Sequence, residues 1–273
     1  MAYRTVASFP KETFLENQHK EDPLLNDYTK LVAHYGSDKY SAPELMKEAL
    51  ICIFFTRCLQ ATGYFGPKEN IQPELNTEEL QIALWIHRFM RISRFNCHAV
   101  REVSMKTNDS VETCSIGAAI NPTLAMINHS CDSNYGRVWN LEANQVLAFA
   151  TRPIKKGEEV TDGYSGIFSN VPYQERTSIH SKYHFSCLCL ACEQKWPMKN
   201  KLGSQLPSNS KKDKKLAKFK FLLKQKDKKD LKPQEKFDIL KEAVSLAYQI
   251  LKSPHLVICN LENQLYNQLR ILH

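Results

Sequence analysis

The stretch Cys187-Leu-Cys189-Leu-Ala-Cys192 places three thiols within six residues. Three soft ligands at this spacing can meet on one tetrahedral Zn²⁺ ion, at about 2.3 Å each. A structural zinc site needs a fourth ligand, and Cys131 is the candidate because it lies in the polar segment Asn128-His-Ser-Cys131. The sequence therefore predicts one structural zinc site, formed by Cys131, Cys187, Cys189 and Cys192. The alternative is that these thiols are ordinary small core residues.

The remaining cysteines stand apart from this cluster. Cys52 and Cys58 fall within an apolar helical pattern, and Cys97, Cys114 and Cys259 are isolated. We expect these five thiols to pack in the core. An odd total of nine cysteines without a signal peptide favours reduced thiols, and no apolar run is long enough to cross a membrane. The sequence therefore predicts a soluble protein of the cytoplasm or the nucleus, with no membrane partner.

The positive charge is concentrated in one segment. The chain of 273 residues carries a formal net charge of +8, yet 15 lysines and 4 acidic residues lie between Lys195 and Lys236, a local charge of +11. About −3 is left for the rest of the chain, so the globular parts are close to neutral. With 42% apolar residues the chain can bury a real core, which excludes disorder along its whole length.

The lysine run from Lys211 to Lys232 is predicted to lead into a basic helix, because apolar residues such as Leu216 and Phe219 recur at helical intervals. Binding to nucleic acid through this run would depend on neutralising phosphates. No arginine accompanies the lysines, and the interleaved aromatic residues are limited to Phe219 and Phe221. Nucleic acid is therefore not expected as the main partner. A nuclear-import signal at Lys211–Lys215 is the milder alternative.

Two helix starts occur in the first third of the chain. Ser41-Ala-Pro-Glu44 has the pattern of a capping box, which predicts a helix that runs to about Gly63. Asn76-Thr-Glu-Glu79 is a second start, followed by apolar residues at helical spacing. We expect these two helices to pack against each other. Upstream of them we expect only one modest helix, around Tyr28–Val32.

A hairpin and a short helix are predicted in the second half of the chain. Apolar and polar residues alternate in Gln145–Thr151, which predicts a hairpin with Arg137–Asn140. Pro172, whose fixed φ suits a first helical turn, begins a helix that runs to about Lys182. The cysteine cluster follows this helix directly.

The chain ends in a predicted pair of helices. Pro233 and Pro254 each stand at a helix start. They predict an antiparallel pair, Glu235–Leu251 and His255–Leu272, which is what one helical repeat unit looks like. A protein that binds helical repeats is therefore an expected partner.

Four motifs in order carry a resemblance to a known family. They are Asn128-His-Ser-Cys131, Ile154-Lys-Lys-Gly-Glu-Glu-Val160, Tyr164 and Tyr183–Cys192. Together they resemble the C-terminal half of a SET domain followed by its post-SET zinc module. Arg94–Val100 is similar to the start of that half in the SET-and-MYND (SMYD) family of protein-lysine methyltransferases, particularly in members that bear tetratricopeptide-like repeats. The resemblance covers about Ser41–Trp196 and extends only loosely to the C-terminal helices.

The resemblance implies an α+β fold. It would be a partial SET-domain β-fold with a helical insert, a post-SET zinc module and a C-terminal α-helical hairpin. The implied parts are, in order, an N-terminal extension (1–40), the helical insert of the SET domain (41–93), the C-terminal half of the SET domain (94–168), the post-SET zinc module (169–196), a basic linker and helix (197–232) and a repeat-like helical pair (233–273). Zinc would fasten the post-SET segment to the loop that bears Cys131.

The resemblance also implies a reaction, which is methyl transfer from S-adenosyl-L-methionine to a lysine amine of a protein substrate, histone or non-histone. Tyr164 matches the family's catalytic tyrosine, and Tyr183 matches an aromatic residue that walls the lysine channel at the catalytic centre. The residues that match cofactor contacts are Asn96, Asn128, His129 and Phe185. Without the family, the three aromatic residues would be read as core residues and Asn128 as a turn former.

Two features of the family are not found in this sequence. The family's SET domain opens with strands that bear a Gly-x-Gly cofactor loop, whereas no Gly-x-Gly occurs here and Gly63-Tyr-Phe-Gly66 has a different spacing. The paired cysteines of a MYND zinc finger are not found either. The alternative is therefore a catalytically inactive, SET-derived module that binds zinc and a protein partner. Such a module would hold zinc without binding S-adenosyl-L-methionine.

Overall fold

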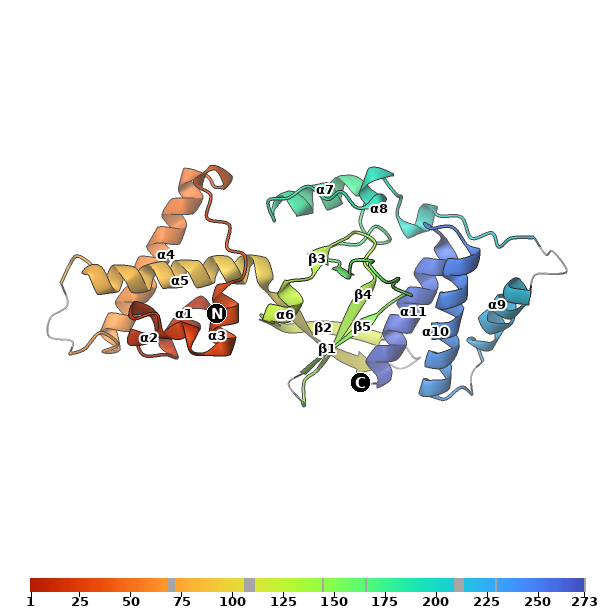
Figure 1. Ribbon diagram of the computed structural model, residues 1–273, viewed down its shortest axis with the longest axis horizontal. Coiled ribbons are helices and arrows are strands. Elements are labelled where there is room, and N and C mark those ends of the chain that lie inside the picture. The colour runs from red at the N-terminus through yellow and green to blue at the C-terminus, as the bar shows by residue number, and fades with distance from the viewer. Residues whose placement is uncertain are drawn as a thin grey trace. The chain divides into compact units, whose positions relative to one another are not determined.

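The computed structural model describes residues 1–67, 72–105, 111–143, 145–164, 166–208, 214–228 and 230–272. The start of the lysine run, Lys211–Asp213, lies outside the described residues. Two compact units form: the first comprises Met1–Ala99 and Gly117–Met126, and the second comprises Val100–Ile116 and Ile127–His273. Figure 1 labels their helices and strands along the chain.

The first unit is built from helices. Its two long helices are α4 (Ala42–Ala61) and α5 (Thr77–Asn96), which pack against each other as predicted. Both begin at the predicted capping boxes. The Glu79 N–H donates to the Asn76 side chain at 3.0 Å, and the Asn76 N–H donates back to the Glu79 carboxylate at 2.9 Å. These bonds satisfy backbone groups that a helix N-terminus leaves free.

The chain before Ser41 forms more structure than the sequence predicted. In place of one modest helix there are α1 (Ala2–Ala7), α2 (Glu12–Leu15) and α3 (Pro23–Thr29). Their buried side chains cover the aromatic face of α5, where Tyr28 stacks on Phe89 with ring centroids 5.0 Å apart. These helices have only 6, 4 and 7 residues, which is too short to show a helical period, so tertiary packing decides their formation. The short helix α6 (Pro122–Ala125) completes the unit.

The strands of the described residues form three pairs. β1 (His98–Met105) pairs with β2 (Val111–Ala119), and the residues of this pair are divided between the two units. β3 (Asn128–His129) pairs with β6 (Thr161–Asp162) in parallel, and β4 (Tyr135–Asn140) pairs with β5 (Gln145–Ala150) in the predicted antiparallel hairpin. The β1–β2 pair was not predicted, because 114–118 are all exposed and show no alternation between buried and exposed faces.

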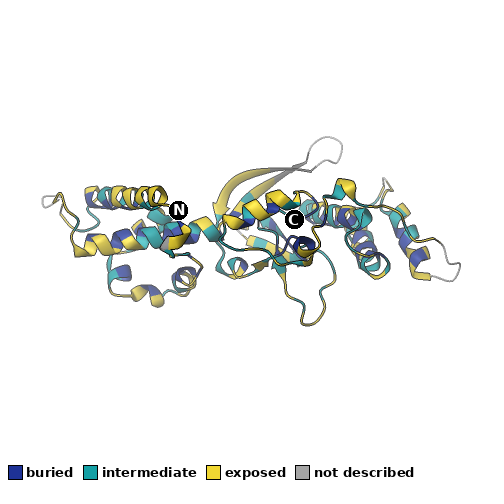
Figure 2. Ribbon diagram, turned by 90° about the horizontal axis from the view of Figure 1, so that it is seen from above, coloured by how far each residue is buried: buried dark blue, intermediate teal, exposed yellow. Residues whose placement is uncertain are grey.

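Five α-helices follow in the described part of the second unit. They are α7 (Tyr173–Ser181), α8 (Leu190–Glu193), α9 (Lys214–Gln225), α10 (Pro233–Ile250) and α11 (Leu256–Leu272). The helix after Pro172, the basic helix and the C-terminal pair are therefore confirmed. Leu216, Phe219 and Leu222 of α9 are buried against α10, and Lys218 of α9 forms an ion pair with Glu242 of α10. Figure 2 shows buried and exposed faces alternating around these helices.

Helix α11 packs on the β4–β5 hairpin. The Tyr266 hydroxyl donates to the Arg137 carbonyl at 2.7 Å, and the Tyr266 ring lies 5.6 Å from the Phe149 ring. A Cβ atom at Gly136 would lie 2.8 Å from the Phe149 ring and 3.1 Å from the Tyr266 ring. The missing side chain at this position is therefore what allows the helix and the hairpin to approach so closely.

The prediction that the five isolated cysteines pack in the core was wrong for two of them. Cys52 and Cys259 are buried, as predicted, and Cys58 is half-buried, but Cys97 and Cys114 are exposed. Cys97 follows the end of α5, and Cys114 lies on the exposed strand β2, so neither position has a core beside it. No described helix is both long enough and apolar enough to cross a membrane.

A substitution in α5 tests the helical core. Ile86 is fully buried, whereas Leu84 on the same helix is 67% exposed. We expect Ile86→Ala to lower the free energy of unfolding by about 2–5 kcal/mol, because it leaves a cavity. Leu84→Ala is expected to change it by less than about 0.5 kcal/mol. Urea unfolding followed by circular dichroism measures both, and equal losses would contradict this packing.

Candidate functional site

The parallel pair of β3 and β6 positions the loop that bears Cys131. The Ser130 N–H donates to the Asp162 carbonyl at 3.0 Å, and the Phe168 N–H donates to the Cys131 carbonyl at 2.9 Å. The Tyr164 N–H donates to Nδ1 of His129 at 3.1 Å. Residues 128–131 are therefore held along Asp162, Tyr164 and Phe168 by two backbone–backbone bonds and one bond to the His129 ring.

A buried asparagine ties the same segments together. Asn134 is 1% exposed. Its amide oxygen accepts from the Thr161 N–H at 2.9 Å, and its amide nitrogen donates to the Glu159 carbonyl at 2.8 Å. Its own carbonyl accepts from the Thr151 N–H at 3.0 Å. Asn134 was not predicted, although its place in a polar loop three residues after Cys131 is a signal that could have found it.

Of the other three predicted cysteines, Cys187 and Cys189 lie on the loop between α7 and α8. Cys189 precedes α8, and Cys192 lies within it. Arg176 of α7 is fully buried and donates to the carbonyls of Val171 at 2.8 Å and Ala191 at 3.3 Å. A buried guanidinium stabilises the structure when its donors meet carbonyl oxygens. Arg176 therefore fixes the cysteine loop on α7.

The structure brings the four predicted cysteines together. Their sulfur atoms all lie within 4.8 Å of one another, and the sulfurs of Cys131 and Cys192 are 3.4 Å apart. Zinc–sulfur bonds of about 2.3 Å in a tetrahedron separate the sulfurs by about 3.8 Å. The spacing of the four thiols thus fits one tetrahedral ion. Their role as ligands stays a prediction.

The thiols of the cluster differ in their pKa values. A hydrogen bond to Cys189, together with burial, raises the pKa of the Cys131 thiol, and the same bond lowers the pKa of Cys189 to about 3. Burial raises the pKa of Cys187 to about 11. Cys189 therefore loses its proton more readily than Cys131 and Cys187, and a metal ion would have to displace the protons of those two thiols.

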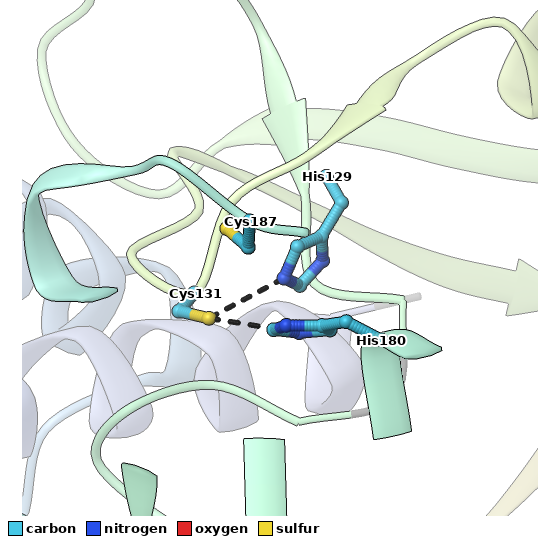
Figure 3. Close-up of side chains that lie close together, drawn as sticks. All are labelled: His129, Cys131, His180 and Cys187. Carbon is cyan, nitrogen blue, oxygen red and sulfur yellow. Dashed lines mark hydrogen bonds between the residues drawn. The ribbon is translucent and has the colours of Figure 1, made fainter. Parts of the chain in front are cut away.

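Two histidines approach the same sulfur, as Figure 3 shows. Nε2 of His129 lies 3.4 Å from the Cys131 sulfur, and Nε2 of His180 lies 3.7 Å from it. These three residues and Cys187 form a second group whose possible ligand atoms lie within 4.8 Å of one another. Burial and the neighbouring His180 lower the pKa of His129 to about 4, so its ring is neutral at physiological pH. His180 was not predicted, since its partner sulfur is 49 residues away in the sequence.

The predicted aromatic residues gather around His129. The Tyr164 ring lies 5.2 Å from the His129 ring and 5.7 Å from the Tyr183 ring. Phe185 lies 5.7 Å from His129 and 6.3 Å from Tyr164. The Tyr164 hydroxyl donates to the Ile127 carbonyl at 2.8 Å, and burial raises its pKa. The group therefore offers several half-buried aromatic faces close to the cysteine cluster.

The two predicted asparagines lie in different units. Asn128 is exposed, and its amide nitrogen donates to the Glu159 carboxylate at 2.7 Å. Asn96 is buried at the end of α5 in the first unit, where its amide nitrogen donates to the Val32 and Ile92 carbonyls, both at 2.8 Å. The roles of both residues as cofactor contacts stay predictions.

Comparison with known proteins places this geometry in a family. The SET domain family model matches residues 6–165. Histone-lysine N-methyltransferase ATXR2 of Arabidopsis thaliana is 37% identical over 87 residues, which are 31% of this chain and 18% of the relative. Histone-lysine N-methyltransferase SMYD3 of Mus musculus and that of Homo sapiens are each 31% identical over 84 residues, which are 31% of this chain and 19% of the relative.

The matched parts are short in comparison with the relatives. The chain spans about a fifth of the length of these curated proteins. The family model, in contrast, covers more than half of the chain, including the loop with His129 and Cys131 and the segment up to Tyr164. The chain therefore belongs to the SET-domain family.

Proposed function

We propose that this chain is part of an S-adenosyl-L-methionine-dependent protein-lysine methyltransferase of the SET-and-MYND type. The observation that carries the proposal is that the rings of His129, Tyr164 and Phe185 gather beside four clustered thiols, in a chain of the SET-domain family. The relatives named as histone-lysine N-methyltransferases support the same reaction. Helices α4 and α5 would be the helical insert, and 169–196 the post-SET module.

The four cysteines would bind one structural zinc ion. Cys131 and Cys192 are 61 residues apart in the sequence, so an ion between them would close a long loop and stabilise the fold. The ion would hold the cysteine loop against the segment that bears His129. It would shape the aromatic site without contacting the methyl group.

S-adenosyl-L-methionine supplies an activated methyl group on a sulfonium centre. The site's chemistry fits a cationic ligand, because aromatic faces attract cations. The Asn128 amide oxygen and the Glu159 carboxylate are acceptors suited to an ammonium group. The Tyr164 hydroxyl has a fixed direction, since it donates to the Ile127 carbonyl, and it would help to orient the methyl group.

The substrate would be a protein with an accessible lysine, from a histone or another protein of the nucleus or cytoplasm. Tyr164 and Tyr183 would wall the channel that receives the lysine. Their rings would exclude water and favour the neutral amine, which is the nucleophile. Alignment of the amine with the methyl group would then supply most of the catalysis. The helix pair α10 and α11 would be the place for a further protein partner.

The rival proposal is a protein-interaction module that binds zinc but has lost catalysis. The absence of Gly-x-Gly from the sequence favours it, because that loop supplies backbone donors to the cofactor in the family. The two proposals agree on the metal and differ in cofactor binding. Measurement of the affinity for S-adenosyl-L-methionine therefore separates them.

Removal of the predicted upstream ligand tests the metal centre. We expect the purified chain to contain one zinc ion and Cys131→Ser to lose it, because three thiols cannot complete the tetrahedron. Cys114→Ser, which removes an exposed thiol outside the cluster, should keep the metal. Atomic absorption measures the zinc content. A full complement of zinc in Cys131→Ser would contradict the assignment.

Tyrosine variants test the reaction. Calorimetric titration of the wild-type chain with S-adenosyl-L-methionine should give micromolar affinity, and Tyr164→Phe should retain it because the ring remains. Methyl transfer to mixed core histones should fall roughly 10²–10³-fold in Tyr164→Phe, since the hydroxyl that orients the methyl group is lost. Tyr266→Phe is the matched control, because its hydroxyl also donates to a backbone carbonyl but lies on α11. No cofactor binding by the wild type would favour the rival.

A further inference from the structure

His180 is a buried polar residue that the proposed reaction does not use. It lies on α7 and is 1% exposed. Its ring stacks on Phe185 at an interplanar angle of 24°, with centroids 5.3 Å apart, and lies 4.4 Å from the His129 ring. These contacts hold Nε2 of His180 3.7 Å from the Cys131 sulfur (Figure 3). The ring contacts therefore fix which nitrogen of His180 faces the thiol.

The hydrogen on His129 can be assigned from its partners. Nδ1 accepts the Tyr164 N–H at 3.1 Å, so Nδ1 carries a lone pair. A neutral imidazole carries its hydrogen on the other nitrogen in that case. Nε2 therefore bears the hydrogen and donates it to the Cys131 sulfur at 3.4 Å. In this arrangement Nε2 has no lone pair for a metal, which argues against coordination by the mixed group of two histidines and two cysteines.

The same reasoning applies to His180. Its Nδ1 is buried and has no hydrogen-bond partner in the described part of the chain. Where Cys131 is a metal-bound thiolate, which can only accept, a hydrogen on Nε2 gives the ring a hydrogen bond to the Cys131 sulfur. A hydrogen on Nδ1 would instead leave a buried donor unsatisfied, which is costly. Both histidines thus direct an N–H group at one sulfur.

We infer that His129 and His180 are positioning residues that donate paired N–H···S hydrogen bonds to Cys131 and thereby strengthen metal binding by that cysteine. The inference rests on the proposed zinc site. A thiolate accepts hydrogen bonds readily because it carries a full negative charge. Two donors spread part of that charge and fix the direction of the side chain, as the second shell of a metal site does. Cys131 needs such support more than the other ligands, because it lies on a separate loop.

Variants of His180 separate the hydrogen bond from packing. His180→Phe keeps a ring for stacking on Phe185 and removes the donor, and His180→Gln keeps an N–H donor on a side chain without a ring. Phe185→Leu is the packing control, because it removes the stacked ring and keeps both histidines. We expect His180→Phe to bind zinc roughly 10–100-fold more weakly, with substantial recovery in His180→Gln. Competition with a chromogenic chelator on the full chain measures this affinity.

The cobalt-substituted chain gives a second readout. Loss of an N–H···S bond raises the energy of the sulfur electrons, so the thiolate-to-cobalt charge-transfer band should move to longer wavelength in His180→Phe and stay unchanged in Phe185→Leu. Equal zinc affinity and equal spectra in wild type and His180→Phe would overturn the inference and leave the metal centre intact. A wild-type chain that binds no zinc would overturn the metal centre, and the inference with it. A cobalt spectrum with fewer than four thiolates would overturn the donor role, because a histidine would then be a ligand.

Discussion

The meeting of Cys131 with the loop Cys187–Cys192 is the constraint on which the site in the second unit depends. Cys131 is fully buried. Its sulfur lies among the sulfurs of the other three cysteines, and its backbone carbonyl accepts from the Phe168 N–H. The neighbouring His129 is bonded to the backbone of Tyr164. The position of the sulfur and the position of the aromatic site are therefore set by the same few residues of the chain.

Packing extends this constraint to the C-terminal helices. Cys259 of α11 is buried in the same cluster as Cys131, Cys192 and Trp196. Beside it the Tyr248 hydroxyl donates to Glu262 at 2.6 Å, and burial raises the pKa of Glu262 to about 7. The last helix thus shares a core with the cysteine loop as well as with the hairpin. A substitution that changes the packing of this cluster should therefore also shift residues of α11, because close-packed interiors transmit strain.

Local signals predicted the long elements well. The capping boxes at Ser41 and Asn76 gave the starts of α4 and α5, since the bonds involved join residues three apart. Before Ser41 one modest helix was predicted where three form, because these helices depend on packing against α5. Cysteine spacing predicted three of the thiols that meet, and the polar segment around Cys131 predicted the fourth, while their role as ligands remains a prediction. The role of His180 could not be predicted from the sequence, since His180 contacts the sulfur of Cys131, which is 49 residues away in the chain.

The most direct test of this account is X-ray absorption at the zinc edge of the purified chain. The account predicts one zinc ion with four sulfur neighbours at about 2.3 Å and no nitrogen neighbour. Two sulfur and two nitrogen neighbours would show that His129 and His180 bind the metal directly. That result would contradict both the four-cysteine centre and the role of the histidines as hydrogen-bond donors.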